Sequence, residues 1–364
     1  MGLKMDFTNT YNVIGLGQCG TRIAQEFEKL GITTAYINSD AGDVRGIKSK
    51  SLFQLDVVGT GASPAKGREM VNKNRRKFNE FLEKNVSDKK INLIIAGAGG
   101  GTGGGVIAPT LEQLKLLGVK TGCLLTLPPM SLGMLTIENA LKTLKEVKNI
   151  DLDMYVLADN DFLIKKCSIS KDWWNNVNKH IANTLLYPFS IIDESKVSKT
   201  GFGSIDRGEI NRILQYGNGL MDIRVVTVKT KDIKHYEDDK ELKALLFEPN
   251  MVAGYEYKYS LAYITSIHTP EKGDYNEFSN RVLQITQKTA GSAMARVGTF
   301  VDSKRKEDIE IVMVNTGLKL PRSLQSRINN LKRDSKRFLD KKNSGERIDL
   351  SIEESVLDDE FDLD

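Results

Sequence analysis

The chain has 364 residues, of which 40% are hydrophobic and 27% are charged, with a net charge of +4. This length is typical of about two globular domains with a sizeable core. The small net charge does not indicate direct DNA binding, and no apolar run reaches the roughly 18 residues that a membrane helix needs, so we expect neither property.

The cysteines, histidines and first residues point to a reducing compartment. The three cysteines lack metal-ligand spacing, and the three histidines are scattered along the chain. The polar start of the chain lacks the apolar core of a signal peptide. We therefore expect a cytoplasmic protein, with no metal site made by protein side chains alone.

A strand–turn–helix–strand pattern comes first. A strand is predicted at 11–14, a helix at 21–30 and a short strand at 35–37. The turn contains GxGxxG at Gly15, Gly17 and Gly20, and Asp40 follows about 20 residues later. This is the dinucleotide-binding fingerprint, so an NAD-dependent oxidoreductase is one hypothesis.

Two more loops of small residues follow. The loop 57–67 leads into a helix predicted at 68–83. The apolar run Leu93–Ala96 predicts a fully buried strand, and Gly99–Gly105 reads GGGTGGG. Because glycine has no side chain to pack, we expect these glycines to expose backbone N–H groups to an anion, most often phosphate.

The elements from 109 to 158 continue the alternation. A helix is predicted at 109–117, a strand at 121–127, a helix at 137–147 and a strand at 153–158. Alternating strands and helices predict an α/β fold with a doubly wound parallel sheet, which binds ligands at the carboxyl ends of its strands.

The number of glycine-rich loops bears on the ligand. A dinucleotide needs one such turn, whereas this chain has three, and GxxxxGK[ST] is absent. We therefore expect a nucleotide with several phosphates, held by many loop amides.

The second half resembles a smaller α/β unit without visible chemistry of its own. Strands are predicted at 223–228, 255–264 and 309–314, and a helix at 275–289. A basic amphipathic helix is predicted at 320–342, followed by an acidic tail at 343–364 that we expect to be disordered.

Several motifs resemble the tubulin/FtsZ family, in its order, over residues 11–165. Gly99–Gly105 resembles the GGGTGTG signature, with Gly104 in place of Thr or Ser. Gly17–Gly20 resembles the GQCG loop of tubulin, and Asn38–Asp40 resembles its NTD. Residues 59–67 resemble the third loop of FtsZ, and Asp159–Leu163 the guanine-side loop.

The resemblance implies the tubulin/FtsZ fold. It places a Rossmann-like GTP-binding domain at 1–168, a central helix at 169–190, and an activation domain at 191–319 with a catalytic loop at 200–212. The C-terminal helix and tail would follow.

The resemblance also implies GTP or GDP with Mg²⁺ as the bound groups. Trp174 would stack on guanine, and Asn178, one turn later, would read it together with Asn160; the alternative is that the adjacent tryptophans belong to the core. The nucleotide-binding residues implied are Gly17, Gln18, Cys19, Asn38, Asp40, Gly61, Ala62, Gly99, Gly100, Gly101, Thr102, Gly103, Gly104, Asn160, Trp174 and Asn178.

The loop at 200–212 resembles the family's NxDxxD/E motif, with Ser204 in place of Asn and with Asp206 and Glu209 at the acidic positions. The resemblance implies that these two residues are catalytic in GTP hydrolysis and complete the nucleotide site of the next subunit. A capping box at a helix start is the alternative. A site divided between subunits implies a heterologous, head-to-tail filament.

Within the family, the chain most resembles TubZ, the plasmid and phage tubulins. The arginine expected after Gly133 in division-type FtsZ is absent, Ser204 departs from the usual Asn, and the terminal helix is basic. The resemblance implies filaments in the cytoplasm of a bacterial host cell. They would segregate plasmid or phage DNA through a DNA-bound centromere adaptor of TubR type, held by the C-terminal region. A division or phage-centring filament is the alternative.

Overall fold

The computed structural model describes residues 10–47, 51–167, 173–190, 199–202, 205, 208–209, 212–213, 219–303, 305–327, 329–330 and 333. Asp206, the tail and most of the predicted C-terminal helix lie outside these residues. Within the described ranges, none of the helices is both long and apolar enough to cross a membrane.

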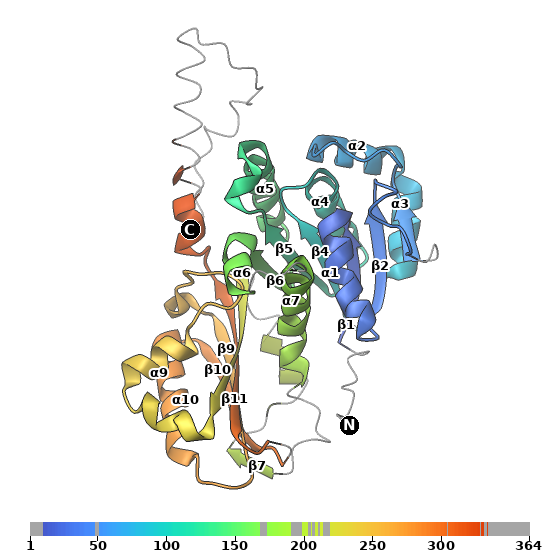
Figure 1. Cartoon of the computed structure of the whole chain (residues 1–364). Helices are drawn as coiled ribbons and strands as arrows, with labels where there is room; N and C mark the ends of the chain where they lie inside the picture. The colour runs from blue at the N-terminus through green and yellow to red at the C-terminus, as the bar shows by residue number, and fades with distance from the viewer. Residues whose placement is uncertain are drawn as a thin grey trace.

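One sheet runs through the described chain (Figure 1). β3 through β8 in its order are parallel, β11 is antiparallel to both neighbours, and β7 is antiparallel to β10. In spatial order its eleven strands are β3 (Leu52–Gln54), β2 (Thr33–Asn38), β1 (Tyr11–Leu16), β4 (Ile91–Gly97), β5 (Thr121–Leu127), β6 (Met154–Asp159), β8 (Leu220–Lys229), β11 (Asp308–Leu318), β9 (Ala262–Thr269), β10 (Met294–Val301) and β7 (Lys199–Phe202).

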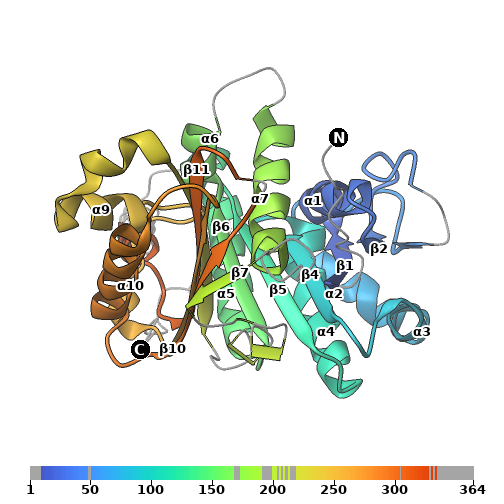
Figure 2. The same ribbon diagram turned by 90° about the horizontal axis from the view of Figure 1, so that it is seen from below.

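Helices cover both faces of the sheet. Figure 2 shows α1 and α7 on one side of β1 and β4, and α2, α3 and α4 on the other. This doubly wound arrangement confirms the predicted α/β class. The helices are α1 (Gly17–Lys29), α2 (Pro64–Lys73), α3 (Arg75–Asn85), α4 (Gly101–Leu116), α5 (Met134–Lys148), α6 (Asn160–Lys166), α7 (Trp173–Ser190), α9 (Asp239–Leu246) and α10 (Asn276–Ala290).

In the second half of the sheet, successive residues of β11 enter two different cores. In β11, Ile311 and Met313 belong to the small core beneath α9 and α10. Val312 and Val314 point the other way, into the main core, and α7 contacts β11. The central helix is therefore packed against both halves. The predicted domain boundaries at 168, 190 and 319 stay predictions.

Three predicted elements differ from the structure. The helix expected at 109 begins at Gly101, so Pro109 lies inside α4. The helix expected at 68–83 is two helices that meet at Asn74. The strand expected at 255–264 begins only at Ala262, because residues 257–259 form a 3-10 turn. Tyrosine alternation alone did not distinguish that turn from a strand. The elements β3, β7, β10, α6 and α9 were not predicted.

Candidate nucleotide-binding site

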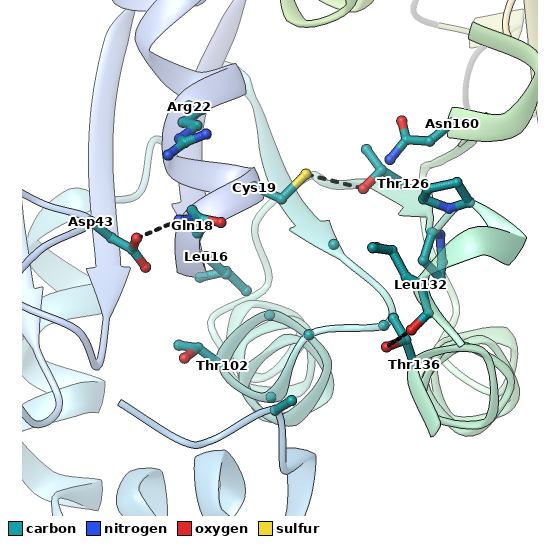
Figure 3. A pocket seen from close by; sticks show the side chains of 18 of the residues that line it. Leu16, Gln18, Cys19, Arg22, Asp43, Thr102, Thr126, Leu132, Thr136 and Asn160 are labelled. Atoms are coloured by element: carbon teal, nitrogen blue, oxygen red, sulfur yellow. Dashed lines mark hydrogen bonds between the residues drawn. The ribbon is translucent and has the colours of Figure 1, made fainter. Parts of the chain in front are cut away.

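A cavity of about 500 Å³ lies at the carboxyl ends of β1, β4, β5 and β6 (Figure 3). β1 leads through α1 to β2 on one side, whereas β4 leads through α4 to β5 on the other. The order in which the strands are added to the sheet therefore reverses between β1 and β4. Doubly wound sheets bind ligands at this switch point. The volume is within the usual range for small-molecule sites, about 300–1,000 Å³.

Most of the residues proposed to bind nucleotide line this cavity. They are Gln18, Cys19, Ala62, Gly99, Gly100, Gly101, Thr102, Gly103, Asn160, Trp174 and Asn178. Sequence reasoning missed other lining residues, namely Leu16, Arg22, Asp43, Thr60, Gly97, Thr126, Pro128, Pro129, Leu132 and Thr136. Thr60 belongs to the loop motif 59–67 but was not named as a ligand. The others carry no recognised motif and reach the cavity because their strands and helices end there.

Two helix N-termini meet at one end of the cavity. α4 begins at Gly101 after Gly100, and its first intrahelical bond runs from Gly104 N to Gly100 O at 2.9 Å. α1 begins at Gly17, directly after β1. The first N–H groups of a helix lack intrahelical partners and carry the positive end of the macrodipole. This end therefore suits the phosphates of a ligand.

The glycines of α4 also serve packing, and on this point the sequence-based expectation was wrong. A Cβ on Gly105 would lie 2.2 Å from the carbonyl oxygen of Pro64 in α2. A Cβ on Gly104 would lie 2.7 Å from the Thr143 hydroxyl in α5. Close approach of α4 to α2 and α5 thus requires glycine at both positions, neither of which lines the cavity.

Asn139 joins two of the loops at the phosphate end. Its side-chain amide donates to the carbonyl oxygens of Ala62, at 2.8 Å, and Gly99, at 3.4 Å. Gly61 and Ala62 have φ values of 59° and 60°. For alanine this left-handed conformation is strained, by roughly 1–2 kcal/mol. Asn139 therefore holds a strained loop at the cavity edge.

The opposite end offers amide groups and an aromatic ring. Asn160 is the first residue of α6, whose N-terminus is capped by the Asp159 carboxylate accepting from Asp161 N at 3.0 Å. Trp174 and Asn178 lie one turn apart on α7, and both line the cavity. The rings of Trp173 and Trp174 stack with centroids 3.8 Å apart. Trp173 packs against the core, so it backs the ring of Trp174, which is 38% exposed.

Side-chain pairs order the middle of the cavity. Gln18 donates to Asp43 at 2.7 Å, and the Cys19 thiol lies 3.1 Å from the Thr126 hydroxyl. Both pairs are drawn in Figure 3. Burial raises the pKa of Cys19, against smaller opposing effects of Thr126 and Arg22. Cys19 is therefore a neutral thiol near pH 7, suited to hydrogen bonding rather than to nucleophilic attack.

Five residues proposed as nucleotide ligands do not line the cavity: Gly17, Asn38, Asp40, Gly61 and Gly104. The buried Asn38 amide oxygen accepts from the backbone N–H groups of Ser39 and Asp40, at 2.7 and 3.1 Å. The Ser39 hydroxyl in turn lies 2.6 Å from the Thr102 hydroxyl. Asn38 thus orders the turn that contacts Thr102.

The dinucleotide hypothesis needs an acidic residue at the ligand's ribose. The Asp40 carboxylate instead accepts from Gly42 N at 2.7 Å. Gly15 and Gly20 do not discriminate, because a dinucleotide-binding turn also uses glycine for close packing; a Cβ on Gly20 would lie 2.1 Å from Ile95 O and one on Gly15 would lie 2.5 Å from Gly20 O. The placement of Asp40, which does not line the cavity, does not favour an NAD site.

Glu209, the described acidic residue of the loop 200–212, lies apart from the cavity. Glu209 pairs with Arg296 of β10 at 2.9 Å and is not among the lining residues. Asp206 lies outside the described residues. Within the described part of the chain, Glu209 therefore does not reach the cavity of its own molecule.

Comparison with known proteins agrees with this geometry. Residues 11–168 match the model of the Tubulin/FtsZ family, GTPase domain. The tubulin-like protein CetZ of Pyrococcus furiosus is 24% identical over 354 residues, 92% of each chain. The cell division protein FtsZ of Aquifex aeolicus is 25% identical over 316 residues, 84% of this chain and 82% of its own.

Solved structures show the same architecture over nearly the whole chain. A GTPγS-form protofilament of TubZ from Bacillus thuringiensis serovar israelensis superposes with a TM-score of 0.78 at 19% identity, covering 94% of this chain and 95% of that one. CetZ from Methanosaeta thermophila gives 0.71 at 19% identity, covering 92% and 93%. Residues 11–168 thus match the GTPase domain of the Tubulin/FtsZ family, and the chain has the tubulin/FtsZ fold.

Proposed function

We propose that the protein binds GTP and GDP, hydrolyses GTP, and assembles head to tail into cytoskeletal filaments. The observation that carries this proposal is the cavity itself. Two helix N-termini lie at one end, and Asn160, Trp174 and Asn178 lie at the other. This polarity matches a molecule with phosphates at one end and a planar base at the other.

The lining residues fit a guanine nucleotide with Mg²⁺. Mg²⁺ keeps several waters and binds through phosphate oxygens with few protein ligands, so it needs no dedicated cage. Among the residues that line the cavity, Asp43 supplies a carboxylate, and Thr60 and Thr102 supply hydroxyl groups. When bound, the ion would neutralise phosphate charge.

Hydrolysis needs a carboxylate that orients water in line with the γ-phosphate. We assign this role to Asp206 and Glu209 of the next subunit. The position of Glu209, paired with Arg296 and away from its own cavity, supports a site completed between subunits. Such an interface is heterologous and builds a filament. The TubZ neighbours are themselves protofilaments.

For the cellular role, we propose segregation of plasmid or phage DNA in the bacterial cytoplasm, through an adaptor of TubR type held by the C-terminal region. The fold similarity to TubZ supports this role. The sequence relatives CetZ and FtsZ favour a second candidate, a division-type or other cytoskeletal filament. A pull-down with the full chain separates the two candidates. Capture of a DNA-bound adaptor that is lost when residues 343–364 or 320–364 are deleted would favour DNA segregation.

Nucleotide-dependent sedimentation tests the central proposal. We expect the full chain to pellet with GTP and Mg²⁺, but not with GDP or NAD, and electron microscopy of the pellet to show filaments. Assembly with NAD but not with GTP would overturn the proposal.

The acidic loop has its own test. Asp206→Ala should assemble with GTP yet release phosphate slowly, because the water-orienting carboxylate is lost while the cavity is intact. Rapid phosphate release by Asp206→Ala filaments would contradict the catalytic assignment.

A further inference from the structure

One arginine from the C-terminal segment contacts the rim of the cavity. Residues 322–327 are helical and follow β11 (Figure 1). The Arg327 guanidinium pairs with Asp159 at 3.1 Å and with Asp161 at 3.2 Å, and it also donates to the carbonyl oxygen of Pro128. Its side chain is 12% exposed.

The two aspartates that Arg327 contacts order the start of α6 at the cavity wall. Asp159 caps α6, and Asp161 accepts from Met130 N at 3.1 Å, which ties α6 to the turn after β5. Asn160 lies between the two aspartates and lines the cavity together with Pro128. Arg327 therefore fixes both the loop that presents Asn160 and the wall beside it.

The setting makes this contact specific to arginine. A guanidinium can donate to several acceptors in a fixed plane, whereas a lysine ammonium is a single point charge. Burial raises the pKa of Asp159, and Arg327 opposes that shift. Without Arg327, two neighbouring carboxylates at the start of α6 would lose their shared counter-charge, and the loop would lose its fixed position.

We propose that Arg327 is a positioning residue for the guanine-reading Asn160, and that it couples the C-terminal helix to the occupancy of the nucleotide cavity. This inference rests on the proposed function, because it needs a bound guanine nucleotide. By linkage, whatever breaks the Arg327 contact at this rim weakens nucleotide binding, and bound nucleotide strengthens the docking of residues 322–327 there.

The same helix offers a matched control. Arg322 makes a bidentate pair with Glu256, at 2.7 and 2.9 Å, and its backbone N–H donates to Gly254 O. This pair also attaches the helix to the protein, but it does not touch a residue that lines the cavity. Arg322→Ala therefore removes a docking contact of the helix without removing the contact to Asn160's loop.

The test is GDP affinity across a double-mutant cycle. Affinity is read from tryptophan fluorescence in the full chain, because Trp173 and Trp174 are its two tryptophans. Arg327→Ala should weaken GDP binding by up to about tenfold, the fold-change of one displaced hydrogen bond. Arg327→Lys should recover only part of this loss, and Arg322→Ala should bind as the unaltered chain does. In the double variant with Asn160→Ala, the two losses should be clearly less than additive.

Hydrogen exchange supplies the reciprocal readout. GDP should slow amide exchange across residues 322–327 in the unaltered chain, but not in Arg327→Ala. The inference is overturned if Arg327→Ala binds GDP normally, if Arg322→Ala loses as much, if the losses with Asn160→Ala add fully, or if GDP leaves exchange unchanged. If the unaltered chain does not bind GDP at all, the proposed function itself fails.

Discussion

Asn139 provides a direct test of how the cavity is built, because no sequence motif predicts its contacts. Its buried amide bridges the carbonyls of Ala62 and Gly99, from two different loops. In Asn139→Ala the carbonyl oxygen of Ala62 loses its hydrogen-bond donor, and the strained left-handed conformation of Ala62 relaxes. Binding must then restore about 1–2 kcal/mol of strain, which weakens GDP affinity roughly five- to thirtyfold.

The expected stability effect is smaller. Ala62 is exposed, so water replaces Asn139 at its carbonyl, whereas Gly99 is buried. We expect a loss of about 1 kcal/mol in the free energy of unfolding, at the low end for a buried acceptor left unpaired. Urea unfolding followed by tryptophan fluorescence measures it, and GDP titration measures the affinity.

Two further variants make the reasoning falsifiable. Asn250 is similarly buried and donates to Thr184 and to the carbonyl of Ile223, at 3.2 and 3.0 Å, away from the cavity. Asn250→Ala should lose stability yet bind GDP normally. Adding Ala62→Gly to Asn139→Ala should recover affinity, since glycine adopts this φ without strain. Normal GDP binding by Asn139→Ala, or equal weakening by Asn250→Ala, would refute the account.

Three other predictions concern single substitutions. Gly105→Ala places a methyl group against the backbone of Pro64 and should cost about 1–3 kcal/mol of stability. A Cβ on Gly100 has its nearest atom at 3.8 Å, so Gly100→Ala should fold normally but lose GDP affinity. Urea unfolding and GDP titration distinguish the two variants, and a stable Gly105→Ala would contradict the packing role. Trp174→Ala should weaken GDP binding by about tenfold or less through the lost stacking surface, measured with a fluorescent GDP analogue, and unchanged affinity would place the base elsewhere. Burial lowers the pKa of His268 to about 4, against about 6.5 when unfolded. The unfolded state therefore binds a proton first, so stability should fall by up to about 3 kcal/mol as pH drops from about 6.5 to 4. A His268→Gln variant should lack this component in urea unfolding at each pH, and identical pH dependence in both proteins would disprove it.

The order of strands and loops along the first half follows from the sequence alone, because each depends on local patterns. Continuous apolar runs such as Leu93–Ala96 mark strands buried on both faces, and glycine or proline marks their ends. Since parallel strands all end at one edge, the loops after them had to meet there. Hence most of the residues expected at the nucleotide, from Gln18 to Asn178, line one cavity.

Tertiary contacts decided the rest, because they join residues whose separation no local pattern encodes. Gly104 and Gly105 are glycine because α2 and α5 approach α4, and Asn38 orders a turn rather than lining the cavity. Arg327 and Asp159, 168 residues apart, form an ion pair at the cavity rim. A stripe of apolar residues predicts a basic amphipathic helix at 320–342, but only packing shows which of its arginines contacts that rim.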